Sequence, residues 1–354
     1  MMYIARQRLS FPALHQSTGG AGSTHGHNYT LTAELAGPVR PDGVIVDYAA
    51  VSERLAELRP REVGANTIEA LWAAWQPGWA AGVSAHGLTI VDGGGRGGLR
   101  HPGGSLFVHS GGFSAAHRTH APRLSDAENR TLYGICDNPA GHGHNYRVTV
   151  WHPTLAALPP DLWAEFDHRN LSVDLPDLRG RNVVTEAIAE LIARRVPGAE
   201  RLRVWETDVF FAEYAPASGA YTLGRRYTFS AAHGFETPAG GAAVYGPCAA
   251  AARHGHDFTL AVAVTAPALD PLTETACDLG RVDRAAAHVL ADLQEADLDG
   301  GVRWLSGGPA TPERLAKRIG ERLAAELGEA LSQVGVWAWP DHEAWQLRGE
   351  DGQR

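Results

Sequence analysis

The sequence predicts an α+β fold in which one small unit occurs three times in tandem, the strands joining into an antiparallel barrel with the helices outside. Three repeated features predict this. An apolar segment ending in histidine occurs three times, a His-Gly-His motif that begins an alternating strand pattern follows each copy, and a helix-start pattern comes after each motif. The 354 residues suffice for three units of about 100–130 residues.

The first two strands of each unit carry the repeated histidines. The first strand reads FPALH at residues 11–15, FSAAH at 113–117 and FSAAH at 229–233. The second strand begins with HGHNYTLTAEL at His25, HGHNYRVTVW at His142 and HGHDFTLAVAV at His254. Apolar and polar residues that alternate with period two indicate half-buried strands.

Helical sequence follows each strand pair. In the third unit Thr311 suits the N-cap and Pro312 suits the first helical position. Residues 184–186 and 66–69 occupy the same place in the other units, and residues 125–128 form a capping-box pattern. An apolar strand then closes each unit at residues 88–92, 202–211 and 333–340, with a possible final strand after it.

Turn-rich segments mark the expected unit boundaries. Residues 93–98 are glycine except for one arginine, and residues 216–219 read Pro-Ala-Ser-Gly. The expected units therefore span residues 1–98, 99–218 and 219–354. Closing the sheets edge to edge into a barrel leaves no exposed strand edge, which favours packing of the three units against one another.

The composition argues against several other classes of protein. The formal net charge of −9 disfavours a nucleic-acid binder with a broad basic face. No segment approaches the roughly 20 apolar residues of a membrane helix, and the N-terminus lacks the apolar region of a secretion signal. Three cysteines do not make a disulfide framework, and Cys277 is expected to be a small buried residue. We therefore expect a cytoplasmic protein without a nucleic-acid or membrane partner.

The histidine pattern is typical of a metal site. Residues i and i+2 of a strand share a face, so His142 and His144 can bind one ion while His117 completes a triad from the neighbouring strand. Three imidazoles with an open fourth position are typical of catalytic zinc. The equivalent residues are His15, His25 and His27 in the first unit and His233, His254 and His256 in the third. One or two of the triads, the first above all, could be inherited but empty.

Four segments of the middle unit carry a family resemblance: residues 113–150, 167–170 (DHRN), 183–189 (VVTEAIA) and 204–208 (VWETD). In this order they resemble 6-pyruvoyl-tetrahydropterin synthase and its relative 6-carboxy-tetrahydropterin synthase, and the other two units match more weakly. The family has the tunnelling fold, in which three subunits usually form a twelve-stranded antiparallel barrel and two such rings stack. The resemblance thus implies three tunnelling-fold units in a covalent pseudo-trimer, and a homodimer of such chains.

The resemblance also implies a reaction and the residues that perform it. The implied enzyme is a zinc-dependent lyase that takes 7,8-dihydroneopterin triphosphate, eliminates triphosphate and reduces the pterin ring by internal redox. The implied roles are zinc ligands for His117, His142 and His144, catalytic thiol for Cys136, acid–base pair for Asp167 and His168, and pterin anchor for Glu206 with Thr185 and Glu186 close by.

The units depart from this pattern in different ways. The third unit keeps a candidate catalytic thiol, Cys248, but it lacks the Asp-His pair and has Ala338 at the anchor position. The first unit has Gly19 at the cysteine position and Asp92 at the anchor position. We therefore expect at most one complete site per chain, and the acid–base pair could serve either Cys136 or Cys248.

Two other functions stay open at the level of the sequence. Loss of catalytic groups from two units fits a non-catalytic pterin or purine binder, and a related bicyclic compound could replace the pterin. Within the leading hypothesis, the six residues from Cys136 to His142 and the insert at residues 138–141 look more like the pyruvoyl synthases. A bacterial context would favour the carboxy product used for deazapurine synthesis.

Overall fold

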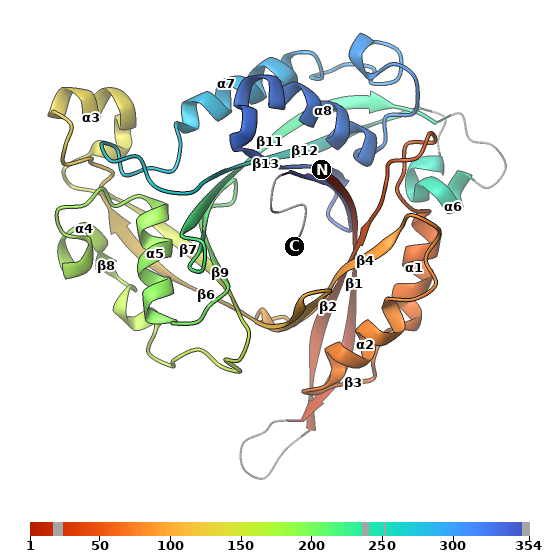
Figure 1. Ribbon diagram of the computed structural model, residues 1–354, viewed down its shortest axis with the longest axis horizontal. Coiled ribbons are helices and arrows are strands. Elements are labelled where there is room, and N and C mark those ends of the chain that lie inside the picture. Colours follow the sequence, from red (N-terminus) through yellow and green to blue (C-terminus); the bar gives the residue numbers. More distant parts are fainter. Residues whose placement is uncertain (17–23, 236–240, 251–252, 349–354) are drawn as a thin grey trace.

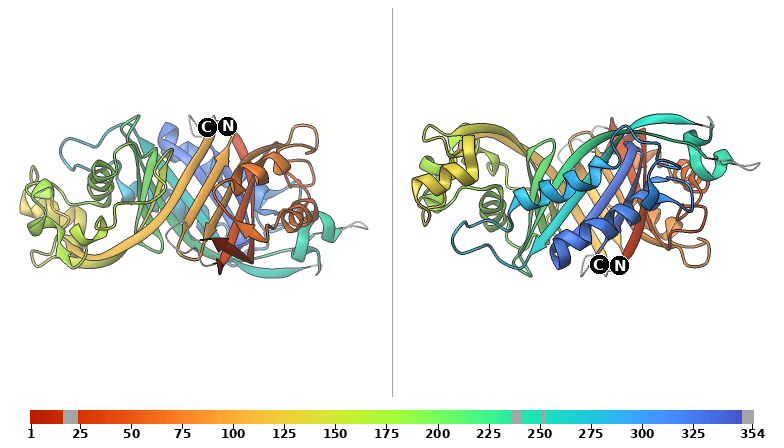
Figure 2. Two further views of the ribbon diagram at one scale, coloured as in Figure 1. Left: turned by 90° about the horizontal axis from the view of Figure 1, so that it is seen from below. Right: turned by 90° about the horizontal axis from the view of Figure 1, so that it is seen from above.

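Twelve long strands form one closed antiparallel barrel with the helices outside it (Figure 1). The computed structural model describes residues 1–16, 24–235, 241–250 and 253–348. The long strands follow one another around the ring in chain order, and β14 pairs with β1 to close it. Seen from the side, long strands cross the ring obliquely (Figure 2). The predicted antiparallel barrel with external helices is confirmed.

The long strands form three consecutive sets of four, here called the first, middle and third sets. The first set comprises β1 (Met2–Gln16), β2 (Thr24–Ala36), β4 (Ser84–Asp92) and β5 (Arg96–His101). The middle set comprises β6 (Gly104–His117), β7 (His142–His152), β9 (Arg201–Thr207) and β10 (Phe210–Ala215). The third set comprises β11 (Ala220–His233), β12 (His254–Ala266), β13 (Leu331–Trp339) and β14 (His342–Leu347).

The helices lie on the outer side of the ring (Figure 1). The α-helices are α1 (Tyr48–Glu57), α2 (Thr67–Trp75), α3 (Asp126–Tyr133), α4 (Leu171–Asp174), α5 (Thr185–Arg195), α6 (Gly241–Tyr245), α7 (Leu279–Ala291) and α8 (Pro312–Leu327). The 3-10 turns are η1 (Gly134–Asp137), η2 (Trp163–Glu165), η3 (Pro176–Leu178), η4 (Gly246–Ala250), η5 (Arg303–Leu305) and η6 (Gly328–Ala330). The two-residue strands β3 (Glu62–Val63) and β8 (Arg169–Asn170) pair in parallel with β1 and β6. No helix in the described ranges combines the length and apolar character needed to cross a membrane.

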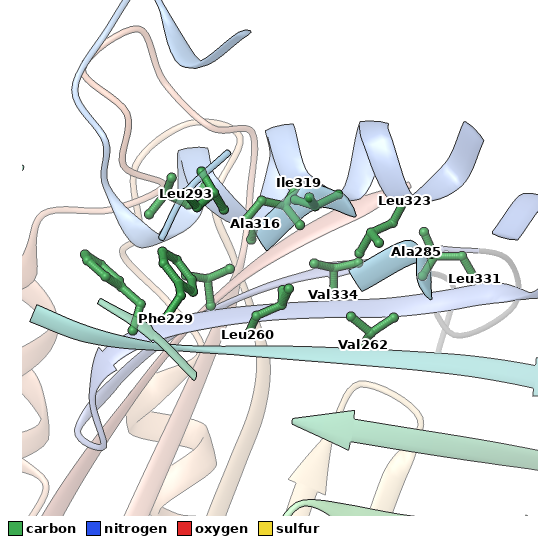
Figure 3. Packing of buried hydrophobic residues seen from close by; sticks show 14 of the residues in the cluster. Phe229, Leu260, Val262, Ala285, Leu293, Ala316, Ile319, Leu323, Leu331 and Val334 are labelled. Carbon is green, nitrogen blue, oxygen red and sulfur yellow. The ribbon is translucent and has the colours of Figure 1, made fainter. Parts of the chain in front are cut away.

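Each set buries an apolar core between its strands and its helices. In the third set, Leu315, Ile319, Leu323 and Leu327 recur every fourth residue along α8 and therefore lie on one face of the helix. That face packs on a strand layer that includes Phe229, as the close view in Figure 3 shows. Burial of these side chains holds α8 against the outer face of the barrel.

Charged side chains line the inner face of the barrel. Because side chains alternate along a strand, the row opposite the apolar cores points inward. Arg203 and Glu213 form an ion pair at 2.8 Å and Arg6 pairs with Glu34, beside a cavity of about 580 Å³. Mutual pairing offsets part of the cost of removing these charges from water.

Most predicted local elements are found. Thr311 caps α8 by accepting a hydrogen bond from the Arg314 amide, and the capping box at Ser125 and Glu128 begins α3. The expected final strands exist as β5, β10 and β14. Residues 43–47, which precede α1, have no counterpart in the middle set, and the 3-10 turn η2 stands there in the place that α1 and α7 occupy in the other sets.

Two local predictions are corrected. Residues 93–95 form the turn between β4 and β5, and residues 96–98 begin β5, so this segment is a hairpin rather than a linker. Glycine suits it because the backbone of β4 approaches Gly97 too closely for a side chain. Residues 202–211 were predicted as one strand, but residues 208–209 turn the chain between β9 and β10. Residues 216–219 form the turn between β10 and β11.

Candidate metal centre and active site

Three histidine clusters lie where the first two strands of each set meet their connecting loop. The register pairs His15 with His25, His117 with His142, and His233 with His254. The third histidine lies two residues further along the second strand and therefore on the same face. The nitrogen, sulfur or carboxylate atoms of each group lie within 4.8 Å of one another: His15, His25 and His27; His117, His142, His144 and Glu206; and His233, Cys248, His254 and His256.

The middle cluster has the properties of a metal site. His117 is buried, and its Nδ1 lies 2.6 Å from the carbonyl oxygen of Val183, just before α5. This contact orients the ring so that Nε2 remains available to the cluster. The atoms His117 Nε2, His144 Nε2 and both ring nitrogens of His142 are buried without a hydrogen-bond partner. Burial lowers the pKa of His117 and His142, which favours the neutral, metal-binding form.

Glu206 belongs to the middle cluster through β9. Arg147 of β7 pairs with Trp205 of β9, which places Glu206 beside the histidines of the neighbouring strand. Its Oε1 lies 3.4 Å from His144 Nε2, and the Thr185 hydroxyl donates a short hydrogen bond to its Oε2. Thr185, at the N-terminus of α5, therefore holds the Glu206 carboxylate at the candidate metal centre.

Cys136 lies outside this group of ligand atoms, on η1. Burial, followed by the nearby Glu206 carboxylate, raises the pKa of its thiol. Its backbone is held from both sides: the Cys136 carbonyl accepts a hydrogen bond from the Thr119 amide, and the neighbouring Asp137 carboxylate binds Arg118. Sequence reasoning missed this buried aspartate, although it directly follows the predicted thiol.

Asp167 and His168 form the predicted pair. Asp167 Oδ2 lies 2.8 Å from His168 Nδ1, and its Oδ1 accepts a hydrogen bond from the Ser114 amide at 2.8 Å. The Ser114 amide, and then His168, lower the pKa of Asp167. His168 has a positive φ of 55° and its side chain is 83% exposed. The pair is thus preformed but faces solvent.

A segment of the third set covers the middle site. Glu186 on α5 is buried and accepts a hydrogen bond from the Ala276 amide at 3.0 Å. The Asn182 side chain donates to the Thr273 carbonyl at 2.7 Å, and the Asn182 amide donates to Glu274. Burial raises the pKa of Glu186 to about 7. Sequence reasoning missed this cover because its contacts are largely made by backbone atoms.

The third cluster is covered in the same manner by the first set. The Thr311 hydroxyl donates to the Gly43 carbonyl, and the Tyr245 hydroxyl donates to the Asp42 carbonyl. The first cluster, by contrast, includes the exposed His25. The sequence of the middle set has no counterpart of residues 43–47.

The strand registers locate the predicted departures from the middle site. Phe258 and Tyr29 correspond to Tyr146, which lies next to the Arg147–Trp205 pair. Through this alignment, Ala338 occupies the Glu206 position in the third set, and Asp92, which pairs with Tyr29, occupies it in the first.

Comparisons with known proteins identify a family that matches most of the chain. The sequence model of the family described as 6-pyruvoyl tetrahydropterin synthase matches residues 108–217 and 222–348. These two stretches correspond closely to the middle and third sets of strands. Together they cover more than half of the chain.

Curated relatives match about one unit of this chain. The 6-pyruvoyl tetrahydrobiopterin synthase of Poecilia reticulata is 36% identical over 117 residues, covering 27% of this chain and 80% of the relative. The human protein of that name is 35% identical over 117 residues, covering 27% and 81%. A solved structure of Caenorhabditis elegans 6-pyruvoyl tetrahydropterin synthase covers 37% of this chain and 96% of its own, at 23% identity and a TM-score of 0.34.

Proposed function

Because this chain belongs to the 6-pyruvoyl tetrahydropterin synthase family, we propose that it is a zinc-dependent lyase acting on 7,8-dihydroneopterin triphosphate. The proposed reaction eliminates triphosphate and yields a 6-pyruvoyl-tetrahydropterin, which keeps all three side-chain carbons, or a 6-carboxy-tetrahydropterin, for which a C–C bond also breaks and the other two carbons leave as a two-carbon aldehyde. One observation carries the proposal. Among the three clusters, only the middle one combines a histidine triad with a carboxylate in the ligand group, while its cysteine, Cys136, lies outside that group.

We propose three tandem tunnelling-fold units that form a pseudo-trimer within one chain. The expected bounds, 1–98, 99–218 and 219–354, are kept except at the first boundary, which we move to the turn at residues 102–103 because β5 belongs to the first set. Three sets of four strands, each with a histidine cluster at the same register position, support this division. So does the way in which a segment of one set covers the site of the preceding one.

His117, His142 and His144 are proposed to hold Zn²⁺. Their buried ring nitrogens without hydrogen-bond partners fit a cation, and His117 is oriented by the Val183 carbonyl. When bound, the ion would polarise the substrate's side-chain oxygens and acidify the adjacent groups. His15, His25 and His27, and His233, His254 and His256, are the corresponding candidate ligands of the other units.

Cys136 is proposed to take up a proton from the substrate side chain as a thiolate; because burial and Glu206 raise the pKa of its thiol, a bound zinc ion nearby would have to favour the thiolate. Asp167 and His168 are proposed to move the second proton, with the Asp167 carboxylate holding His168 through Nδ1. A homodimer in which two rings stack is proposed from the family resemblance alone.

The family resemblance implies Glu206 as the pterin anchor with Thr185 and Glu186 close by; because Glu206 lies beside the histidines, we propose that Glu186 shares the recognition of the pterin. A carboxylate that accepts two N–H bonds from the guanidine-like edge of a pterin gives planar recognition. Glu186 already accepts a backbone amide hydrogen bond at the covered site, so its carboxylate is positioned for such donors. Glu206 lies closer to the histidines, and its short bond from Thr185 supports a role at the reacting side chain.

The decisive experiment incubates the zinc-loaded full-length protein with 7,8-dihydroneopterin triphosphate and identifies the products by mass spectrometry. Released triphosphate together with a pyruvoyl- or carboxy-tetrahydropterin is the expected result and also identifies the product. Unchanged substrate in the presence of bound zinc would contradict the enzyme proposal. It would then favour a non-catalytic pterin or purine binder, or an enzyme acting on a related bicyclic compound.

A further inference from the structure

The third cluster differs from the middle one in the place of its cysteine. Cys248 Sγ lies 3.5 Å from His233 Nε2 and 3.4 Å from His256 Nε2. His254 Nε2 lies 3.2 Å from His233 Nε2. One sulfur and three imidazoles therefore converge on one point.

The two cysteines stand at the same sequence position, six residues before the first histidine of the motif. Nevertheless, Cys136 is partly exposed and outside its ligand group, whereas Cys248 is 3% exposed and inside. The ligand that the middle cluster takes from β9, Glu206, is replaced by Ala338 in the third set. The sulfur of Cys248 thus lies in the third group of candidate ligand atoms as the Glu206 carboxylate lies in the middle group.

On the side of Cys248, the space beside the third cluster is filled by side chains of the described residues. The cavity next to Cys248 measures only about 20 Å³, which leaves room for about one water molecule. Phe235 and Tyr245 stack there with ring centroids 4.6 Å apart, and Trp339 stacks on His342. A second, shallow and open hollow of about 470 Å³ is lined by His256, Ser230 and Glu295, so it is only on the Cys248 side that the described residues leave no room for a bicyclic ring system.

The third set also keeps the backbone that holds the Asp-His pair in the middle set, but it lacks the aspartate and the histidine. Glu295 has a φ of 58° and donates its amide to the Ser230 carbonyl at 2.6 Å, as His168 does to Ser114. Gln294 takes the place of Asp167 and accepts the Ser230 amide. An Asp-His pair is thus replaced by Gln-Glu on an equivalent backbone.

We infer that His233, Cys248, His254 and His256 form a closed, four-coordinate structural zinc site rather than a second active site. Structural zinc sites have four protein ligands, usually including cysteine, and no open position. Binding converts the Cys248 thiol to a thiolate ligand and releases its proton to solvent. The ion would join β11 and β12 to η4, whose Gly246 packs against Tyr48 of the first set. The site therefore lies at the seam between two sets.

The test replaces zinc with Co²⁺ in the full-length protein and records its absorption spectrum. A cobalt–thiolate bond produces an intense near-ultraviolet charge-transfer band. We expect this band in the unaltered protein, in Cys136→Ser and in Cys277→Ser, and its loss in Cys248→Ser. A band that survives Cys248→Ser, or that disappears in Cys136→Ser alone, would overturn the inference.

A second measurement does not depend on the folding of a variant. The zinc-loaded unaltered protein is treated with a thiol-alkylating reagent before and after removal of the metal by a chelator, and modified peptides are identified by mass spectrometry. We expect Cys248 to become labelled only after chelation and Cys136 to be labelled in both states. Equal labelling of Cys248 in both states would overturn the inference.

The inference can fail independently of the proposed enzymatic function. With Cys248→Ser we expect zinc affinity at the third cluster to fall by more than the roughly 10–100-fold that loss of a hydrogen-bond partner to a metal ligand costs. We expect the turnover number of this variant, calculated per folded protein whose middle site holds zinc, to be unchanged. If Cys248→Ser abolishes turnover while the protein stays folded and keeps its cobalt–thiolate band, Cys248 is a catalytic thiol and the structural assignment is wrong.

Discussion

At the scale of single residues, a few substitutions distinguish three clusters built on nearly the same backbone. Glu206 corresponds to Ala338 and Asp92 through the strand registers. His168 and Glu295 share an uncommon positive φ and the same backbone hydrogen bond, although only the first carries an imidazole. The third set therefore keeps the backbone geometry of this position, although it lacks the imidazole that the middle set has there.

Cys136→Ser tests the proposed thiol. A general base typically contributes roughly 10²–10⁴-fold to a rate, so we expect kcat to fall by about that factor. Because Cys136 lies outside the ligand group, bound zinc at the middle cluster should not change. Steady-state kinetics and metal analysis of the same samples check both expectations. Full activity in Cys136→Ser would show that another group removes the proton.

Glu186 makes stability depend on pH. Its pKa is raised to about 7 by burial, so below a pH of about 4.5 its contribution to stability is fully present, and it is lost as the pH rises through about 7. A rise of this size corresponds to about 3 kcal/mol. We expect the free energy of unfolding of Glu186→Gln, relative to the unaltered protein, to improve by up to that amount between pH 5 and pH 8.

Urea denaturation of both proteins at the two pH values measures this difference. Because the other titrating groups are common to both proteins, their effect cancels in the comparison. A difference that does not change with pH would show that Glu186 is ionised throughout.

At the scale of elements, the connection after the second strand of each set decides whether the preceding site is covered. The third set covers the middle site, since Thr273 and Ala276 contact Asn182 and Glu186. The first set covers the third site through Gly43. The middle set lacks a counterpart of this segment and has only the 3-10 turn η2 where the other sets have α1 and α7.

Thr311→Ala tests the link between the first and third sets. The Thr311 hydroxyl both caps α8 and donates to the Gly43 carbonyl. Loss of an N-cap costs about 1 kcal/mol and loss of a buried hydrogen bond about 1 kcal/mol. We expect the free energy of unfolding to fall by about 2 kcal/mol in urea denaturation.

Ser125→Ala is the matched control, because Ser125 caps α3 through its hydroxyl within its own set. We expect a loss of about 1 kcal/mol in this variant. Equal losses in the two variants would mean that the bond to Gly43 contributes nothing to stability.

At the scale of the whole molecule, closure of the barrel joins the two ends of the described chain. β1 pairs with β14 over six residues, from Met2 with Leu347 to Gln7 with His342. Arg6 bridges this seam, since it pairs with Glu34 of β2 and with Glu343 of β14. Closure therefore removes both sheet edges, which would otherwise be open to pairing with other chains.

Arg6→Met should destabilise the closed ring more than Arg8→Met. Removing Arg6 leaves Glu34 without its ion-pair partner and removes one of the arginines that pair with Glu343. Breaking a buried ion pair costs about 3–5 kcal/mol. We expect a loss near the lower value, because Arg6 is partly exposed. Arg8→Met leaves Glu343 paired with Arg6 and should cost about 1 kcal/mol or less. Urea denaturation of the two variants measures both, and a larger loss for Arg8→Met would contradict the role of Arg6 in the seam.

Local patterns in the sequence determined much of this protein. Alternation of period two, N-cap residues such as Thr311, and the repeated His-Gly-His motif are encoded within a few residues, so they predicted the elements, the threefold repeat and the histidine clusters. Segments 93–98 and 202–211 were misjudged because glycine content and an apolar run do not show where a chain reverses. The tertiary structure alone decided which sulfur joins a ligand group, which carboxylate lies beside the histidines, and which segment covers which site. Each of these outcomes is a distance between residues that are far apart in the chain. Such distances are set by strand register and by the packing of whole sets of strands, which no short stretch of sequence encodes.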